Sequence, residues 1–275
     1  MTDKTILITG ASGFIGARLF EKLNDFNPIG LMNQNRIKSD QGKTIKCDLR
    51  NQIEIQKIIG EVQPDIIFHF VAMTNPKHNE ENHEDARALN VAITENLIHA
   101  LDTKNTHMIF LSTDKVFDGA EPNPDESSKT NPLWLYGSLK LECEKLIDEK
   151  ISKYHIIRLP IVHSCGEAHS TSFIDRALIN LNNGKQIEVF KNVRRCYVRL
   201  NELIAFLEKL ITDSHYGIYH AGSVCMSYYE RIRMLCKENG ISVEGKLVPI
   251  EGVAKPLEQN LNTEKLEQIF NFNFN

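Results

Sequence analysis

The chain has 275 residues, 41% of them hydrophobic and 25% charged, with a formal net charge of -4 at pH 7. This length suffices for one large domain or two smaller ones, and the composition excludes a wholly disordered chain. Acidic and basic residues are interleaved, which predicts neither a nucleic acid nor a membrane as a partner. No apolar run reaches the roughly 18 residues of a membrane helix, and the N-terminus has no signal-peptide pattern, so we expect a cytoplasmic protein.

Alternating strand and helix patterns occupy the first part of the chain. The apolar run 5–9 predicts a strand buried on both faces, and a glycine turn and helical spacing follow over 10–23. This alternation predicts an α/β fold, a Rossmann-type doubly wound parallel sheet. Further strands are expected at 28–32, 65–70, 107–111 and 155–159, and further helices at 53–59, 86–101 and 135–149.

The pattern loosens after Val162, where we expect a smaller, discontinuous C-terminal lobe that binds substrate. The NAD(P)-binding domain would cover 1–165 with a returning segment at about 197–224, and the lobe would comprise 166–196 and 225–275. Within these later regions, short strands are expected at 187–190, 217–220 and 247–250, and helices at 200–211, 227–240 and 263–270.

Cysteine and histidine spacing predicts no metal site. The six cysteines contain no Cys-x-x-Cys pair, and in a cytoplasmic chain we expect all of them to be reduced and mostly buried. The histidines form no metal-binding pattern. His78 and His83 are close in the chain, but we expect the acidic stretch around them to be a solvated loop.

Gly10, Gly13 and Gly16 form a GxxGxxG pattern between a predicted strand and a predicted helix. Glycines in this position permit a tight turn and let the backbone approach a pyrophosphate at the helix N-terminus. The pattern predicts a dinucleotide site rather than a purely structural turn. The other residues expected to bind the cofactor in this turn are Ser12, Phe14 and Ile15.

The segment after the second predicted strand bears on the choice between NAD(H) and NADP(H). It has Asn33 and no acid at the strand end that would hold a ribose 2′-hydroxyl, and Arg36 lies nearby. The sequence therefore favours NADP(H), with NAD(H) and a solvated Arg36 left open. Asp48 and Leu49 lie where adenine contacts are expected in this kind of fold.

Tyr136 and Lys140 form a YxxxK pattern, and residues four apart share one face of a helix. The lysine can lie beside the tyrosine, lower its pKa and hold a nicotinamide ribose. Upstream, Ser112-Thr113 ends a predicted strand, where a hydroxyl would face a cleft at the carboxyl edge of the sheet. Together these residues predict a catalytic Thr113–Tyr136–Lys140 set.

Several stretches of the chain match motifs of one oxidoreductase family. They are 8–16, 72–74, 89–91 with 96–97, 112–119, 136–140 and 158–160, with later echoes at 217–222, 227–230 and 262–266. Through them the chain resembles the extended short-chain dehydrogenases/reductases and, among these, the dTDP-4-dehydrorhamnose reductase-like branch. The resemblance spans nearly the whole chain, and its first two-thirds is the most specific part.

The resemblance implies a role for each catalytic residue. Thr113 would hydrogen-bond the substrate carbonyl, Tyr136 would donate its proton, and Lys140 would bind the ribose and tune Tyr136. The substrate would be a nucleotide-linked 4-keto-6-deoxy sugar, reduced by NADPH or NADH in the biosynthesis of cell-surface polysaccharide sugars. Further cofactor contacts implied by the resemblance are Ala72, Met73, Thr74, Asn90, Leu159 and Pro160.

Two departures from the family pattern concern the substrate. Lys115 follows Asp114 at a position where relatives have tyrosine. Asp114 and Lys115 are both candidate contacts to the substrate. A solvated Lys115 is the alternative. Arg194 and Arg195 replace the usual stretch in the small lobe. Their guanidinium groups suit a substrate diphosphate, and solvated surface charges are the alternative.

Two other functions remain open on the sequence. A nucleotide-sugar 4,6-dehydratase or epimerase would use tightly bound oxidised cofactor, and Ser112-Thr113-Asp114-Lys115 is similar to a stretch of such dehydratases. A non-catalytic, dinucleotide-binding regulatory subunit is the other alternative, because the chain also resembles the β subunit of methionine adenosyltransferase. The expected partners are a nucleotide-sugar substrate and, as a candidate assembly, a homodimer.

Overall fold

The computed structural model describes residues 4–33, 42–165, 172–252 and 258–275, and the chain divides into two compact units. Unit 1 comprises Met1–Val116, Thr130–Arg158 and Ile204–Tyr219. Unit 2 comprises Phe117–Lys129, Leu159–Leu203 and His220–Asn275. Both units are therefore assembled from segments that are distant in the sequence.

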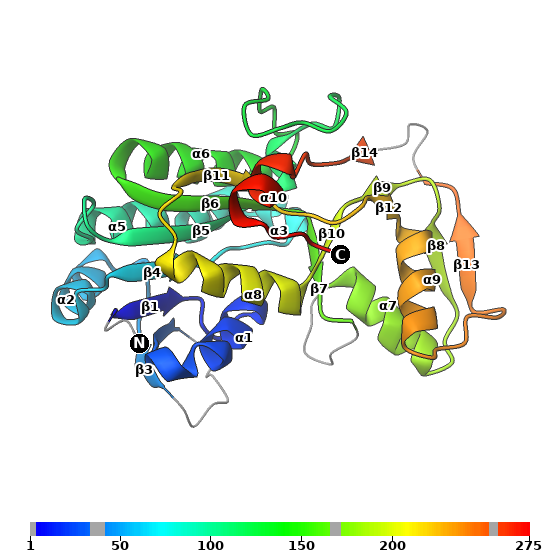
Figure 1. Cartoon of the computed structure of the whole chain (residues 1–275), viewed down its shortest axis with the longest axis horizontal. Helices are drawn as coiled ribbons and strands as arrows, with labels where there is room; N and C mark the ends of the chain where they lie inside the picture. Colours follow the sequence, from blue (N-terminus) through cyan, green and yellow to red (C-terminus); the bar gives the residue numbers. More distant parts are fainter. Residues whose placement is uncertain (1–3, 34–41, 166–171, 253–257) are drawn as a thin grey trace. The chain divides into compact units, whose positions relative to one another are not determined.

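Within the described residues, a seven-stranded sheet is built mainly from unit 1, in the order β11-β6-β5-β4-β1-β2-β3 (Figure 1). The ladders between β3 and β2, β2 and β1, β1 and β4, and β4 and β5 are all parallel. The order reverses beside β1, as in a doubly wound fold, so the predicted fold class is confirmed. The strands are β1 Ile6–Thr9, β2 Ile29–Met32, β3 Lys43–Lys46, β4 Ile66–His69, β5 His107–Thr113, β6 Lys153–Leu159 and β11 Gly217–His220.

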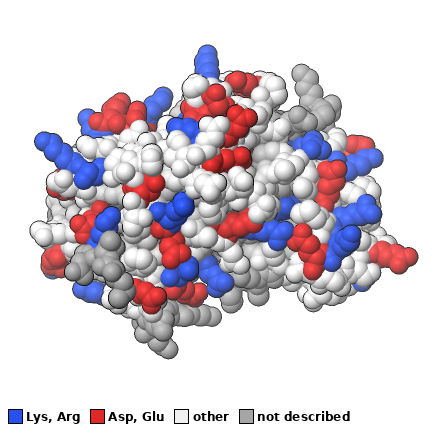
Figure 2. Space-filling view, in the orientation of Figure 1, with Lys and Arg blue, Asp and Glu red and all other residues white. Residues whose placement is uncertain are grey.

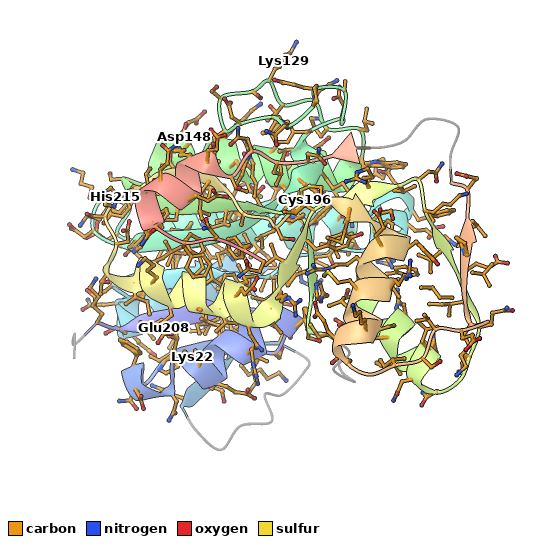
Figure 3. The ribbon with its side chains drawn as sticks, turned by 45° about the vertical axis from the view of Figure 1, so that its right-hand side comes forward. Lys22, Lys129, Asp148, Cys196, Glu208 and His215 are labelled. Atoms are coloured by element: carbon orange, nitrogen blue, oxygen red, sulfur yellow. A yellow bond between two sulfur atoms is a disulfide. The ribbon has the colours of Figure 1, made fainter. Side chains whose placement is uncertain are left out.

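Helices cover both faces of this sheet because successive side chains of each strand point to opposite faces. On one face, Leu7, Ile67 and Met108 pack in a core with residues of α2, α5 and α6. On the other side, Lys22 of α1 and Glu208 of α8 form an ion pair at 3.2 Å (Figure 3). The bounds are α1 Phe14–Lys22, α2 Gln52–Val62, α5 Ile93–Ala100, α6 Leu135–Lys150 and α8 Leu200–Lys209, with short 3-10 turns at Asn24–Phe26, Asp114–Val116 (η3) and Leu210–Thr212.

The long helix expected over 86–101 is interrupted. The structure has α4 (His83–Arg87), a π-helical turn (Ala88–Ala92) and then α5. The Asn90 side chain donates to the Ala86 carbonyl at 2.9 Å, so it competes for a main-chain acceptor of the helix. Such π turns are frequent at functional sites.

The acidic stretch around His78 and His83 is helical, so the expectation of a loop is wrong, although the stretch is solvated as expected. Helix α3 (Pro76–Glu81) begins after Asn75, whose side chain accepts from the His78 amide at 3.1 Å. Proline at the first helical position favours this start. Both histidines are exposed on these short helices.

Unit 2 has its own core, in which residues of α7 and α9 pack with Val189, Tyr197 and Leu247. Its short strands pair as β10-β7, β12-β9-β14 and β13-β8. Helix α9 begins with a capping box between Ser227 and Glu230. The bounds are β7 Ile161–His163, α7 Phe173–Asn182, β8 Ile187–Phe190, β9 Arg194–Arg195, β10 Tyr197–Arg199, β12 Met226–Ser227, α9 Tyr228–Glu238, β13 Leu247–Ile250, β14 Glu258–Gln259 and α10 Glu264–Phe270.

Acidic and basic side chains are mixed over the face shown in Figure 2, in keeping with the interleaved sequence. In the described part of the chain, none of the helices combines the length and apolarity needed to cross a bilayer.

Candidate functional site

The glycine turn after β1 has the geometry expected for a dinucleotide. Gly10 has φ +67°, and a Cβ on Gly16 would lie 2.1 Å from the Gly10 carbonyl oxygen. Only glycine fits there, because a side chain would separate α1 from the turn. Gly13 precedes α1 without a side-chain cap, and the first turn contains no acidic residue. The first N–H groups of α1 therefore have no helical acceptor and suit an anion.

Two segments are expected to bind the adenosine part of the cofactor, one after β2 and one after β3, and they differ in burial. Asn33 is exposed, whereas Arg36 lies outside the described residues. The Asp48 carboxylate accepts from Arg50 at 2.7 and 3.0 Å, and this hydrogen bonding holds its pKa below the usual range. Leu49 is 6% exposed and belongs to the core. A contact with adenine remains a prediction for Asp48 and Leu49.

The loop 72–74 after β4 is held by two buried asparagines. Asn90 accepts from the Met73 amide at 3.1 Å, and Asn79 donates to the Met73 carbonyl at 2.9 Å. Asn90 also donates to the Asn79 side chain at 3.3 Å. The structure thus places Asn90 as a support for this loop. Asn79, which sequence reasoning missed, supports the same main chain.

The carboxyl end of β5 presents Thr113 and Asp114, both buried. The Thr113 hydroxyl donates to Asp114 Oδ1 at 3.2 Å and accepts from the Lys115 amide at 3.2 Å. Lys115 is half-buried, and its contact with a substrate remains a prediction beside the alternative of a solvated lysine. The Thr113 proton can be redirected from Asp114 to another acceptor by rotation of one bond.

Tyr136 lies in the first turn of α6, which packs on η3. A Cβ on Gly137 would lie 2.2 Å from the Lys115 carbonyl oxygen, so the two backbones are in close contact. Burial raises the pKa of the Tyr136 phenol above its usual range, and the Asp114 carboxylate adds to this effect. The direction is opposite to the lowering expected from Lys140. A phenol in this state keeps its proton and can act as a donor.

Lys140 is buried, with Nζ 3.9 Å from the centroid of the Phe110 ring on β5. Burial lowers the pKa of Lys140 to about 8, against the opposing effect of Cys143 and Glu144. Cation–π contact with Phe110 favours the charged form. The structure therefore brings Tyr136, Lys140 and the end of β5 together.

Sequence reasoning missed the buried polar residues that surround this set. His69 of β4 contacts the Thr9 hydroxyl at 2.8 Å and the Thr94 hydroxyl at 3.0 Å. Glu144 is buried one helical turn after Lys140. Its spacing was a usable signal, since a charge at i+4 from a catalytic lysine shares its face.

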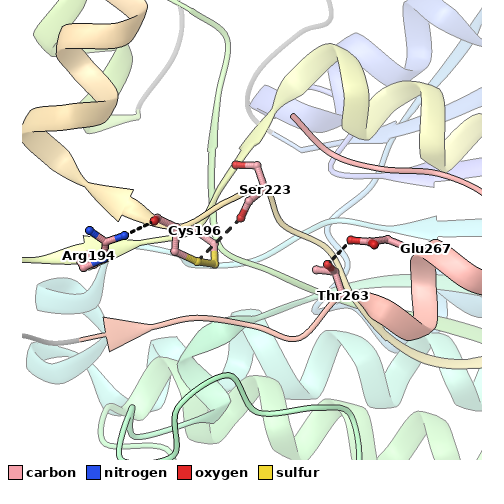
Figure 4. The surroundings of a disulfide bond; sticks show 6 residues. Arg194, Cys196, Ser223, Thr263 and Glu267 are labelled. Carbon is pink, nitrogen blue, oxygen red and sulfur yellow. Dashed lines mark hydrogen bonds between the residues drawn. A yellow bond between two sulfur atoms is a disulfide. The ribbon is translucent and has the colours of Figure 1, made fainter.

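Unit 2 contains the remaining predicted residues. Leu159 and Pro160 are buried at the beginning of the Leu159–Leu203 segment of this unit. Arg194 donates to the Cys225 carbonyl at 2.6 Å (Figure 4). Its ion pair with Glu230 is 3.6 Å. Arg195 is 7% exposed, so the alternative of a solvated surface charge is wrong for this residue.

The expectation that all cysteines are reduced is also wrong, because Cys196 and Cys225 form a disulfide (Figure 4). The pairing of β9 with β12 places these flanking residues close together, although they are 29 positions apart in the chain. Widely spaced cysteines give no sign of such a contact in the sequence. Cys47, Cys143, Cys165 and Cys236 are free thiols.

Comparisons with known sequences identify a family and several relatives of this chain. The family described as "RmlD substrate binding domain" matches residues 4–275. The methionine adenosyltransferase 2 subunit beta of Danio rerio is 34% identical over 58% of this chain and 48% of that protein, so the matched region spans about half of that relative. The same subunit of Xenopus tropicalis is 27% identical over 96% and 81% of the two chains. A dTDP-4-dehydrorhamnose reductase of Aggregatibacter actinomycetemcomitans is 28% identical over 82% and 76%.

Solved structures share the fold at low sequence identity. A dTDP-4-dehydrorhamnose reductase from Bacillus anthracis, in complex with NADP, has a TM-score of 0.82 at 22% identity and covers 98% of this chain and 94% of its own. A UDP-glucose 4-epimerase from Thermotoga maritima, with UDP-glucose, has a TM-score of 0.84 at 17% identity, covering 98% and 93%. These likenesses show that the chain shares the overall fold of these proteins.

Proposed function

Because the chain belongs to the RmlD substrate binding domain family, we propose that it reduces the 4-keto group of a nucleotide-linked 4-keto-6-deoxy sugar, using NADPH or NADH. The observation that carries this proposal is the packing of α6 on the end of β5. It brings the protonated Tyr136 phenol beside Asp114 and places the Lys140 amine over Phe110. A proton donor and a cation at the carboxyl edge of a parallel sheet are suited to carbonyl reduction.

The residues of the glycine turn fit a dinucleotide. The space at Gly16 is closed to any side chain, and the N-terminus of α1 lacks a cap and a nearby acid. These groups would bind the pyrophosphate, and the Lys140 ammonium would bind the nicotinamide ribose. The cofactor supplies hydride when bound. The related reductase structure with NADP and the sequence 33–36 directly after β2, which contains Arg36 and no acid, favour NADP(H), with NAD(H) as the alternative.

The chain's own groups provide the proton and the orientation. The Thr113 hydroxyl turns from Asp114 toward the substrate carbonyl oxygen and donates a hydrogen bond to it. The Tyr136 phenol transfers its proton to the same oxygen as the alcohol forms. Lys140 stabilises the resulting phenolate by its positive charge. Arg194 and Arg195 of unit 2 are proposed diphosphate contacts, with Asp114 and Lys115 as proposed contacts to the sugar.

Tyr136→Phe tests the assigned proton donor. Loss of NADPH absorbance is followed with a panel of 4-keto-6-deoxy nucleotide sugars, with NADH in parallel. We expect turnover by the wild-type protein and a loss of about 100- to 10,000-fold in Tyr136→Phe, with cofactor binding retained. Tyr154→Phe is the matched control, because it removes a hydroxyl that bonds Asp148 elsewhere in unit 1. Unchanged turnover in Tyr136→Phe would contradict the assignment.

A second candidate is a subunit that supports a methionine adenosyltransferase. The observation that favours it is the similarity to methionine adenosyltransferase 2 β subunits, at 34% identity over 58% of this chain for Danio rerio and 27% over 96% for Xenopus tropicalis. Co-elution with a methionine adenosyltransferase catalytic subunit, without oxidation of NADPH by any sugar in the panel, would favour this candidate. Product formation without consumption of reduced cofactor would instead favour a dehydratase or an epimerase.

A further inference from the structure

A buried ion pair in unit 1 lies outside the predicted catalytic set. Glu144 of α6 and Arg158 of β6 have side chains that are 2% and 4% exposed. Arg158 donates from Nη2 to Oε2 at 2.8 Å and from Nε to Oε1 at 3.1 Å. The Ser112 hydroxyl of β5 donates to the same carboxylate. One carboxylate thus connects a helix to two strands.

Two of these residues adjoin predicted catalytic positions. Glu144 lies four residues after Lys140 on α6, and Ser112 directly precedes Thr113 on β5. Strands β5 and β6 are neighbours in the sheet, so Arg158 holds Glu144 against the strand that ends in Thr113. The hydrogen bonds therefore fix α6 against β5 close to both groups.

Glu144 also contributes to the electrostatics of Lys140. Burial lowers the pKa of this amine, and the negative charge of Glu144 acts in the opposite direction. Arg158 and Ser112 keep the carboxylate from rotating away. The amine would lose its proton more readily if this carboxylate were absent.

Stability alone is a weak reason for such a pair. Burying two charges costs solvation free energy, and apolar residues of similar volume often give equal or greater stability. The surrounding core of unit 1 is largely apolar, with Cys143, Ile147 and Ile156 among its members. This contrast indicates a role in arranging the neighbouring groups.

We propose that Glu144 is a positioning residue for the reaction proposed above. Clamped by Arg158 and Ser112, it holds α6 in register with the end of β5 and keeps a negative charge one helical turn from the Lys140 ammonium. This inference rests on the proposed function for its catalytic meaning. Its electrostatic part concerns the chain alone and can be measured without substrate.

The direct test is an NMR titration of Lys140 in protein labelled with ¹³C and ¹⁵N at lysine, with the signal assigned through Lys140→Arg. In Glu144→Gln we expect the titration midpoint to fall by about one pH unit. The matched control is Glu142→Gln on the same helix, which removes a half-exposed partner of Arg87 and should leave the midpoint unchanged. An unchanged midpoint in Glu144→Gln would overturn the proposal.

Glu144→Gln leaves the Arg158 guanidinium buried without its carboxylate, so the variant can fail to fold. Glu144→Gln with Arg158→Met removes both charges and restores an apolar contact. We expect this double variant to melt near the wild-type temperature. Its Lys140 titration midpoint should lie below that of the wild type, as in Glu144→Gln, and its kcat should be lower than that of the wild type by about tenfold or more. If the double variant has the Lys140 titration midpoint and the kcat of the wild type, the Glu144–Arg158 ion pair has only a structural role and the proposal is overturned.

If no sugar of the panel is reduced, the proposed function fails while the titration still reports on Glu144. If the wild-type protein turns over and the Lys140 midpoint is unchanged in Glu144→Gln, only the positioning role fails.

Discussion

At the residue scale, the proposed catalytic residue Lys140 lowers the stability of the fold. Its ammonium is buried and contacts an aromatic ring, and burial lowers its pKa from 10.5 to about 8. The unfolded chain binds a proton more tightly than the folded chain between these two values. Below pH 8, the buried charge therefore carries its full cost, which the ribose and the phenolate would offset during the reaction.

We expect Lys140→Met to stabilise the fold at pH 7 by up to about 3 kcal/mol, at about 1.4 kcal/mol per pKa unit. The difference from wild type should shrink as the pH rises from 8 to 10, because the wild-type lysine loses its proton in the folded state first. Urea unfolding at several pH values measures this difference. Lys145→Met, at an exposed position of the same helix, is the control. A difference that does not vary with pH would contradict the lowered pKa of Lys140.

At the element scale, the position of Tyr136 depends on the contact between α6 and η3. Gly137 permits this contact, because a Cβ there would lie 2.2 Å from the Lys115 carbonyl oxygen and 2.9 Å from its carbon. Backbone atoms cannot rotate away as a flexible side chain can. The start of α6 and the residues after Thr113 must therefore shift together if any side chain is added.

Gly137→Ala should lower turnover by about 100-fold, since a displacement of about 1 Å is enough to misalign reacting groups. The same overpacking should cost about 1–3 kcal/mol of stability. The matched variant is Gly60→Ala on α2, where a Cβ meets nothing within 4 Å. That change should be neutral or stabilising by up to about 1 kcal/mol. Turnover assays and urea unfolding of both variants check these outcomes; equal effects of the two substitutions would contradict the packing argument.

At the scale of the whole molecule, buried neutral histidines occur in both units. Burial lowers the pKa of His69 and His107 to about 3 and that of His155 and His163 to about 4. His107 and His155 share a hydrogen bond of 2.7 Å, and His155 lies 3.3 Å from Asp213. The unfolded chain takes up protons near pH 6.5 while the folded chain does not, so stability falls as the pH falls below that value.

We therefore expect the free energy of unfolding to be nearly constant between pH 7 and 8, below the range in which Lys140 titrates, and to decrease steeply between pH 6.5 and 4. Each buried histidine should contribute about 2 kcal/mol to the decrease between pH 7 and 5. The double variant His107→Gln, His155→Gln should show a smaller decrease, and His99→Gln, at an exposed position, should match the wild type. Chemical unfolding at fixed pH values measures this. An equal decrease in the double variant would show that these histidines do not govern the acid response.

The sequence by itself determined the fold class and the local parts of the site. The alternation of apolar strands and amphipathic helices, the glycine turn before α1 and the spacing of Tyr136 and Lys140 depend on neighbours within one or two elements. Such patterns involve residues that are close in the sequence, and the corresponding strands, helices and glycine turn are present in the structure. The helix expected over 86–101 was interrupted because the Asn90 side chain competes with main-chain hydrogen bonding.

Only the tertiary structure decided which buried polar groups meet. Glu144 and Ser112 are 32 positions apart, and Cys196 and Cys225 are 29 apart, so no periodicity connects them. The raised pKa of Tyr136 and the burial of Arg195 likewise depend on what other elements place around them. The hydrophobic pattern of a helix or strand predicts which of its faces is buried against the rest of the protein. The partner of a buried charge, and the cost of burying it, are set by the segment that folding brings against it.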